Sequence, residues 1–384
     1  MPIDVIGTNP HESTLSDLAD AIDEVLAEHN VGIINRESLS VKRGRNLSCT
    51  FTTTDFGTCF AKRVIGNDQF KASMQAANLI LQDLGSAGQG SFRTPRLIDS
   101  STNGKILIFE GVPKADNLAT ILHENTQDDE QVLRLMDNIG AGLRQVHESL
   151  TNADDLNEEP SPLPPISHFE QLPWSSFESF SAASLQVWGR LQKDKELYHA
   201  VVSLREMENT DVKVPIHGDL RFDQFLFDDD EDLWLIDWEE FRLGHPGRDL
   251  GGLIGEWLHI AFSSLLGETA VSHNVEHVPQ PVYDEELTHE EIVARGQEAL
   301  NRVMPNISAL WNSYLGQNTT IQNTQELATI TAAFAGWHLY DRLLAASELA
   351  PRVSALSWAA AGIGRNILLN PAEAAKNLGL TGSL

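Results

Sequence analysis

The chain has few cysteines and no long apolar run. Its 384 residues contain only 2 cysteines, Cys49 and Cys59. So few cysteines in a long chain are typical of a reducing compartment, although pairing of the two across a hairpin stays open. No stretch approaches the roughly 18 apolar residues that a membrane helix requires. Residues 1–9 have neither the basic nor the apolar region of a signal peptide. These absences predict a cytoplasmic protein with no membrane partner.

Positive charge is also scarce. The chain has 27 lysines and arginines against 55 aspartates and glutamates, which gives a formal net charge of −28. Phosphate-rich partners would be repelled, so we expect neither a nucleic acid nor an anionic membrane as partner. The same excess favours a cationic substrate, and a simple contribution to solubility is the alternative.

The length and composition indicate a globular protein with two parts. A hydrophobic content of 41% and a charged content of 21% are ordinary values. A chain of this length can form two lobes with a core of useful size. We expect residues 1–112 to form a small lobe of strands with an added N-terminal helix. Residues 113–384 are expected to form a larger, mostly helical lobe.

Two acidic motifs are the most informative part of the chain. Residues 217–224 read HGDLRFDQ and residues 235–239 read LIDWE, and the segment between them has the pattern of a short hairpin. Phosphoryl transfer needs one acidic group to orient a hydroxyl and another to hold Mg²⁺, because the protein's part is mostly positioning and charge neutralisation. We expect Asp219 and Asp237 to fill these two roles from loops at the two ends of the hairpin.

These motifs resemble those of a known family. HGDLRFDQFLF followed by LIDWEEFRLGHPGRDL is similar to the catalytic core of the aminoglycoside phosphotransferase and choline kinase-like superfamily, the small-molecule relatives of protein kinases. The family pattern is roughly H-G-D-x-x-x-x-N, then I-D-[WF]-E, then D-L. The resemblance implies an α+β, bilobal protein kinase-like fold, with a small antiparallel-sheet lobe that carries a helix and a larger, mostly helical lobe. It also implies ATP and Mg²⁺ as cofactors and an alcohol group as acceptor.

The resemblance assigns roles to the residues at the matching positions. Asp219 would be the catalytic base, and a turn aspartate is the structural alternative. Metal binding would fall to three residues: Asp237, Gln224 and Glu239. His217 and Asp249 would support the catalytic loop rather than react. Gln224 departs from the family, which has asparagine there, so its longer side chain requires the metal or the loop to shift.

The nucleotide-binding residues are expected earlier in the chain. A helix over residues 15–26 is followed by strands over 38–42, 47–54 and 58–64. Lys62, in the third strand, matches the family lysine that contacts the α- and β-phosphates; an exposed strand lysine is the alternative. Asn46 and Ser48 follow a turn and would donate hydrogen bonds to phosphates, unless the turn is a plain hairpin.

Two further elements complete the expected nucleotide site. A helix over residues 69–84 has Gln75 where the family usually has the glutamate that pairs with the lysine, so Lys62 would be held less firmly. After the apolar strand at 106–109, backbone groups near Glu110 and Val112 are expected to contact adenine. Residues 55–57 spell DFG, the metal motif of protein kinases, but they lie in a turn and are interpreted as a hairpin tip.

The larger lobe is expected to be helical over residues 132–150, 174–199, 250–262 and 321–368. Residues 152–165 have the composition of a surface loop, and the segment 264–290 is interpreted as an insert on the substrate side. Four residues near the C-terminus are available to line an acceptor pocket or simply to pack: Trp337, Asp341, Arg342 and Trp358.

The acceptor itself is left open by the motifs. HGDLRFDQFL, with Arg221 and Gln224 together, is similar to the phosphotransferase-like proteins of class V lanthipeptide and thioamitide biosynthesis. That resemblance implies Ser or Thr of a precursor peptide as acceptor and a separate lyase as partner protein. One alternative is a small-molecule kinase acting on an aminoglycoside, a sugar or an amino alcohol. Another is a pseudokinase scaffold that binds nucleotide or peptide without transfer, which the glutamines at 75 and 224 suggest.

Overall fold

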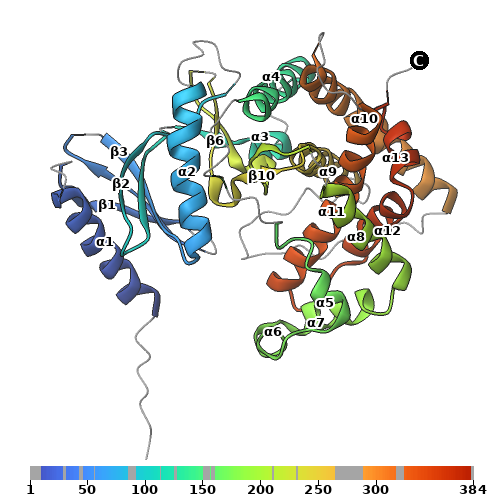
Figure 1. Cartoon of the computed structure of the whole chain (residues 1–384), viewed down its shortest axis with the longest axis horizontal. Helices are drawn as coiled ribbons and strands as arrows, with labels where there is room; N and C mark the ends of the chain where they lie inside the picture. The colour runs from blue at the N-terminus through green and yellow to red at the C-terminus, as the bar shows by residue number, and fades with distance from the viewer. Residues whose placement is uncertain are drawn as a thin grey trace, which may run out of the picture. The chain divides into compact units, whose positions relative to one another are not determined.

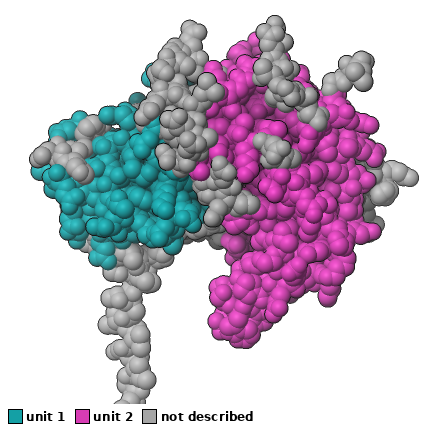
Figure 2. All heavy atoms as spheres, viewed as in Figure 1, with its two compact units in different colours: residues 1–118, 224–241 teal, residues 119–223, 242–384 magenta. Residues whose placement is uncertain are grey.

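The structure, a computed structural model, contains two compact units (Figure 1). The residues it describes are 10–28, 32–42, 46–55, 57–84, 92–112, 114–124, 128–149, 156, 161–209, 212–230, 232–263, 289–316 and 324–381. The first unit contains residues 1–118 and 224–241, and the second contains residues 119–223 and 242–384 (Figure 2). The chain therefore leaves the second unit after Asp223 and returns to it at Arg242.

The first unit is built on a five-stranded antiparallel sheet. Its strands are β1 (Ile34–Lys42), β2 (Leu47–Thr53), β3 (Gly57–Arg63), β4 (Leu97–Ser101) and β5 (Ile106–Glu110), in the order β1-β2-β3-β5-β4. Strands alternate the direction of successive side chains, so each can bury residues on both faces of the sheet. Two helices of this unit, α1 (Pro10–Glu28) and α2 (Asn67–Leu84), cover these faces.

α1 and α2 pack on opposite faces of the sheet (Figure 1). Leu18 and Ile22 of α1 are buried against Cys59 and Ala61 of β3. On the other face, Phe70 of α2 forms a smaller cluster with Val64 and Leu107. The sheet is therefore the middle layer of this unit.

A second, smaller sheet also belongs to the first unit. It consists of β6 (Asp116–Asn117), β8 (Phe225–Phe227) and β9 (Leu233–Leu235) in the order β6-β8-β9. The amide of Arg93 donates to the carbonyl of Leu233 at 2.7 Å, and the amide of Leu235 donates to the carbonyl of Arg93 at 2.7 Å. β8 and β9 form the hairpin that the sequence predicts, and they place a 3-10 turn, η3 (Trp238–Glu240), directly after it.

The second unit is mostly helical. Its helices, the first of which begins at the last residue of the first unit, are α3 (Leu118–Glu124), α4 (Asp129–Glu148), α5 (Ile166–Glu170), α6 (Trp174–Ser179), α7 (Ala182–Leu191), α8 (Lys195–Glu208), α9 (Gly247–Ser263), α10 (His289–Leu315), α11 (Thr324–Leu349), α12 (Ala355–Leu369) and α13 (Pro371–Asn377). The strands β7 (Val214–Ile216) and β10 (Arg242–Gly244) form an antiparallel pair. α9 lies beside α11 (Figure 1). The sheet unit and the helical unit confirm the predicted α+β fold class.

The predicted helices differ from the observed ones mainly where a capping residue interrupts them. The helix expected over 174–199 is three helices, because the side chains of Ser181 and Asp194 accept amide hydrogen bonds at the starts of α7 and α8. The segment 321–368 is likewise split, with Ser354 capping α12.

The two cysteines are both free and buried. In the β2–β3 register Cys49 lies opposite Ala61, and Cys59 lies opposite Phe51, so neither faces the other across the ladder. Burial raises the pKa of Cys49 to about 11. Their thiols therefore belong to the core between the sheet and α1. Among the helices described, none has both the length and the apolar character needed to cross a membrane.

The packing of α1 yields a test of its place in the first unit. Leu18 is fully buried, and Leu18→Ala is expected to lower the free energy of unfolding by about 2–5 kcal/mol, through lost transfer energy and a cavity. Glu24→Ala, at an exposed position of the same helix, is the matched control and should change it by less than about 0.5 kcal/mol. Urea unfolding followed by circular dichroism measures both. Equal effects of the two substitutions would contradict the docked position of α1.

Candidate active site

Lys62 lies on β3 with its ammonium group between two carboxylates. Its Nζ atom is 2.5 Å from Oδ1 of Asp237 and 2.5 Å from Oε2 of Glu239. Strand alternation sends Ala61 toward α1 and Lys62 to the opposite face. Burial alone would lower the pKa of Lys62, but the two carboxylates outweigh it and raise the pKa. Lys62 is therefore held as a charged group.

Arg63 follows the same alternation and points to the other side of the sheet. Its Nη2 atom donates to the carbonyl of Asp17 on α1 at 3.4 Å. Lys62 is therefore the basic side chain that β3 directs to the carboxylates of the turn after β9.

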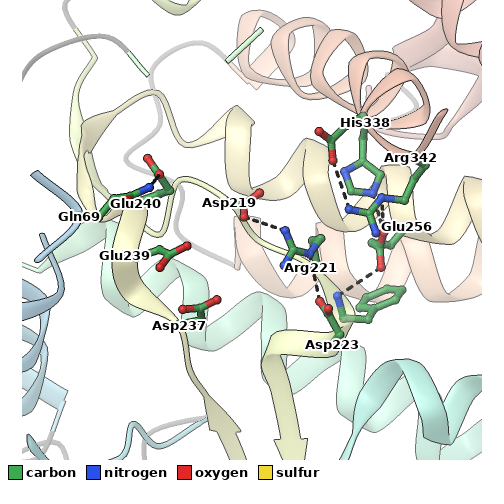
Figure 3. A network of polar contacts seen from close by, with 12 residues as sticks. Gln69, Asp219, Arg221, Asp223, Asp237, Glu239, Glu240, Glu256, His338 and Arg342 are labelled. Carbon is green, nitrogen blue, oxygen red and sulfur yellow. Dashed lines mark hydrogen bonds and ion pairs between the residues drawn. The ribbon is translucent and has the colours of Figure 1, made fainter. Parts of the chain in front are cut away.

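The turn that carries these carboxylates is held by side chains from the large sheet and α2. Nδ2 of Asn46 donates to Oε2 of Glu239 at 2.7 Å, and Oδ1 of Asn46 accepts from the amide of Ile65 at 3.3 Å. Nε2 of Gln69 donates to Oε1 of Glu240 at 3.1 Å (Figure 3). The predicted phosphate ligand Asn46 is thus engaged with Glu239 in this structure.

Asp237 has an unusual backbone conformation. Its φ of 69° and ψ of 47° lie in the left-handed region. Few residues other than glycine adopt this region, and asparagine and aspartate do so more often than the rest. Strained backbone persists only where the surroundings fix it, and it is concentrated at functional sites. The conformation turns the chain sharply between β9 and η3. Asp237 is about a third exposed, with a side-chain fraction of 31%, whereas that of Glu239 is 12%.

The metal assignment fits the donor atoms available in the first unit. Mg²⁺ is usually held by one or two carboxylates together with substrate phosphates and waters, so a full cage of protein ligands is not expected. The described residues contain no cluster of three or more histidine, cysteine, aspartate or glutamate side chains suited to a metal ion. Gln224 is buried, and its backbone carbonyl accepts from the amide of Ile236 at 3.0 Å, which fixes its main chain beside the residue that precedes Asp237.

The other predicted nucleotide ligands also lie in the first unit. Ser48 is buried and lies directly opposite Lys62 in the β2–β3 register. Gln75 is half-buried on α2, but the ion pairs that neutralise Lys62 come from the η3 turn instead. The amide of Glu110 donates to the carbonyl of Arg96 at 2.9 Å, so that group is used within the sheet. The adenine contact therefore stays a prediction for the backbone groups near Glu110 and Val112, apart from the Glu110 amide.

Asp219 lies in the second unit, on the loop after β7, where an arginine pairs with it. Nη1 of Arg221 is 2.7 Å from Oδ2 of Asp219, and its Nε is 3.1 Å from Oδ1 of Asp223 (Figure 3). Desolvation raises the pKa of Asp219 above its ordinary value, and the charge of Asp341 adds to this, while Arg221 opposes it. A carboxylate with a raised pKa is better able to accept a proton.

Asp249, in the first turn of α9, holds the start of this loop. Its carboxylate accepts from the amides of His217 at 2.8 Å and Gly218 at 2.9 Å, and it lies 3.1 Å from Nε2 of His147. Gly218 has a φ of 89°, which suits glycine at this tight turn. Burial opposes ionisation, but the hydrogen bonds from His147 and the amide of Gly218 keep the pKa of Asp249 low. The buried carboxylate therefore fixes the backbone of the two residues that precede Asp219.

A second buried carboxylate, Glu256 of α9, contacts the loop on the other side of Asp219. Its Oε2 accepts from the amide of Phe222 at 3.4 Å, and its Oε1 lies 2.5 Å from Nε2 of His338 and 3.8 Å from Nε of Arg342 (Figure 3). Burial opposes the charge of Glu256, but His338 and Arg342 outweigh it and lower its pKa. The catalytic loop is thus held by one carboxylate before Asp219 and by another after it.

α9 also approaches the loop through a glycine. A Cβ atom at Gly252 would lie 2.7 Å from the carbonyl oxygen of Leu220, closer than real Cβ contacts allow. Between the residues held by Asp249 and the residue held by Glu256, the loop therefore packs directly against the backbone of α9 at Gly252.

A family model identifies the chain. The model of the APH family, described as a phosphotransferase enzyme family, matches residues 46–275, which is more than half of the chain. The chain belongs to this phosphotransferase family. It is therefore an ATP-dependent phosphotransferase with a hydroxyl acceptor.

Solved structures with a similar fold include three kinases of small molecules. The choline kinase LicA from Streptococcus pneumoniae is 16% identical with a TM-score of 0.47, over 92% of this chain and 99% of that one. The AMP-bound spectinomycin phosphotransferase APH(9)-Ia is 14% identical with a TM-score of 0.45, over 94% and 98%. The amicoumacin kinase hAmiN, in complex with AMP-PNP, Ca²⁺ and Ami, is 12% identical with a TM-score of 0.49, over 92% and 96%. A comparison of this chain with curated proteins found no match.

The sequence motifs located the loop and turn aspartates but missed several residues that hold them. His147 is buried and bonds both Asp249 and the hydroxyl of Tyr314, contacts that no motif indicated. Glu256 and His338 carried no motif at all. Their only sequence signal was a charged residue within an otherwise apolar helical segment, which often marks a buried polar contact. Of the insert expected at 264–290, residues 264–288 lie outside the described residues, as do residues 43–45 of the turn before Asn46.

The close approach at Gly252 predicts a specific loss of activity. Gly252→Ala should push the Leu220 carbonyl and the adjacent Asp219 out of place, and we expect kcat to fall about tenfold or more with little change in ATP affinity. Gly189→Ala is the control, because an added Cβ in α7 meets no atom within 4 Å. Steady-state kinetics and nucleotide titration measure both. An unchanged kcat in Gly252→Ala would contradict the support of the loop by α9.

The pairing of Asp219 with Arg221 predicts a shift in the pH profile. A base with a raised pKa loses activity as the pH falls through that pKa. Arg221→Gln removes the charge that opposes the shift, so the acidic limb of kcat/KM should move to higher pH. Arg365→Gln, whose guanidinium pairs with Asp194, should leave the limb where it is. A limb that moves to lower pH in Arg221→Gln would contradict the assignment of this limb to Asp219.

Proposed function

We propose that this phosphotransferase moves the γ-phosphate of ATP to a hydroxyl group of a small organic molecule. One observation carries the proposal. In the region that the family model matches, Asp249 and Glu256 hold the loop on either side of Asp219. A base that must take a proton from a bound alcohol gains from such a fixed position, because positioning supplies much of the rate of these reactions.

The first unit is proposed to bind the nucleotide. Lys62 would contact the phosphates, Ser48 would donate from the neighbouring strand, and the amide of Val112 would contact adenine. Asp237 and the side-chain carbonyl of Gln224 are the oxygen donors that would hold Mg²⁺. Mg²⁺, when bound, neutralises charge on the phosphates of ATP.

The second unit is proposed to activate the acceptor. Asp219 takes the proton of the acceptor hydroxyl at its carboxylate, while the oxygen of that hydroxyl attacks the γ-phosphorus and ADP leaves. Arg221, already 2.7 Å from Asp219, places a fixed positive charge next to the base. Such a charge favours the phosphoryl group that develops negative charge during transfer.

The acceptor that we favour is a small molecule carrying amino groups, which includes the aminoglycosides and amino alcohols among the alternatives given above and leaves out the sugars. The net charge of −28 supports it, because an acidic protein attracts cationic acceptors. The precursor peptide and the lyase partner gain no support from the comparisons. The scaffold alternative loses one of its two motives, because Lys62 has two carboxylate partners although residue 75 is a glutamine.

A pair of substitutions tests the two aspartate roles. Asp219→Asn should keep ATP binding and lose at least about 10² of the transfer rate, the usual contribution of a general base. Asp237→Asn should lose the part of nucleotide affinity that depends on Mg²⁺. Both are measured by calorimetric titration and by mass spectrometry of acceptors after incubation with ATP and Mg²⁺. Asp223→Asn, which changes the other carboxylate bound to Arg221, is the control for a general effect of lost charge.

The acceptor class is read from the same mass spectra. Pools of aminoglycosides, amino alcohols and sugars are compared with Ser/Thr-rich peptides, and a gain of one phosphate identifies the acceptor. Phosphate on the amine-bearing pools is the expected outcome. Phosphate on peptides alone would replace the small-molecule proposal, and undiminished transfer by Asp219→Asn would overturn the role of Asp219.

A further inference from the structure

We propose that Glu239 is the positioning residue for Lys62 and leaves Asp237 available for the metal ion. This inference rests on the proposed function, in which Lys62 contacts the phosphates of ATP. It replaces the prediction that Glu239 is itself a metal ligand. All of the contacts that carry it lie within the first unit.

The first step is the position of Glu239 relative to Lys62. Their charged atoms are 2.5 Å apart, and both side chains are only 12% exposed. A buried ammonium requires a nearby negative charge, because desolvation without a partner costs several kcal/mol. Glu239 meets this requirement with a side chain that is itself shielded from water.

The second step is the absence of a competing glutamate. The sequence of α2, NDQFKASMQAANLILQDL, contains no glutamate, and its aspartate in the first turn, Asp68, is exposed. Among the side chains that the structure describes, the two carboxylates that contact Lys62 are Asp237 and Glu239, both from the turn after β9.

The third step distinguishes these two carboxylates. Oε2 of Glu239 accepts from Lys62 and also from Nδ2 of Asn46 at 2.7 Å, and the next residue, Glu240, is bonded to Gln69 of α2. Glu239 is thus fixed by Asn46, the residue directly before β2. Asp237 is the more exposed of the two, with a side-chain fraction of 31% against 12%. Its side chain is therefore the easier one for an incoming ion to reach.

A division of labour follows from these contacts. Glu239 and Asn46 keep the ammonium of Lys62 in place throughout, so Asp237 can exchange its lysine contact for the metal. Without Glu239, the lysine would have Asp237 as its carboxylate partner and would compete with Mg²⁺ for it.

A double-mutant cycle in the absence of metal tests this role. ATP affinity is measured by calorimetry in EDTA for the wild type, Lys62→Gln, Glu239→Gln and the double variant. Glu239→Gln alone should weaken metal-free ATP binding by about threefold to tenfold, as expected when one member of a contacting pair is lost. In the Lys62→Gln background it should have no further effect, because Glu239 acts through the lysine.

Two outcomes would overturn the inference. One is a loss from Glu239→Gln that is equal in both backgrounds, and the other is a loss that occurs only when Mg²⁺ is present, as a metal ligand would give. Glu240→Gln is the matched control on the same turn, and its effect should multiply with that of Lys62→Gln because Glu240 bonds Gln69 instead.

The experiment separates this inference from the proposed function. If wild-type protein fails to bind ATP, the proposed function is wrong. If it binds ATP but shows no coupling between residues 62 and 239, only the positioning role is wrong. Asn46→Ala provides a second variant should Glu239→Gln unfold, because it removes the hydrogen bond that fixes Glu239 and should show the same non-additivity with Lys62→Gln. Thermal unfolding of each variant establishes that it is folded.

Discussion

The neutralisation of one buried ammonium group determines much of the first unit. Lys62 has an exposed side-chain fraction of 12%, and charge at that depth is stable only beside opposite charge. The carboxylates that supply it lie about 175 residues further along the chain. Residues 224–241 must therefore join the first unit, although the chain on both sides of them belongs to the second. The hairpin, the left-handed Asp237 and the hydrogen bonds of Asn46 and Gln69 all serve to bring that charge to the sheet.

The second unit solves a similar problem around a loop instead of a side chain. Backbone amides at a sharp bend have no partner in a helix or sheet, and leaving them unpaired in the interior is costly. Asp249 accepts from two of these amides, and Glu256 accepts from a third, that of Phe222. Each of these carboxylates is in turn contacted by a histidine, His147 or His338. Asp219 is consequently carried on a bend whose two sides are tied to the same helix.

Local features of the structure could be predicted from the sequence, whereas long-range contacts could not. The strands around Lys62, the hairpin before Asp237 and the apolar helix after Asp249 could be predicted, because periodicity and turn residues are local signals. The residue types of a family motif also located Asp219. The partner of Lys62 could not be found in this way, since the pairing depends on the path of the chain between β3 and η3. The contacts of His147 and Glu256 were missed for the same reason: the partners of each residue are set by how the helices pack, which no local pattern indicates. The interruption at Ser181 was readable in principle, because serine is a common N-cap.

The passage of the chain between units at Asp223 and Phe241 has a consequence for building hybrid enzymes from members of this family. A nucleotide-binding half taken from one parent by a single cut after residue 112 would carry Lys62 but leave Asp237 and Glu239 with the other parent. The ammonium would then depend on carboxylates that had evolved beside the sheet of the other parent. A functional graft would have to exchange two pieces together, residues 1–118 and residues 224–241, so that the lysine travels with the carboxylates that hold it.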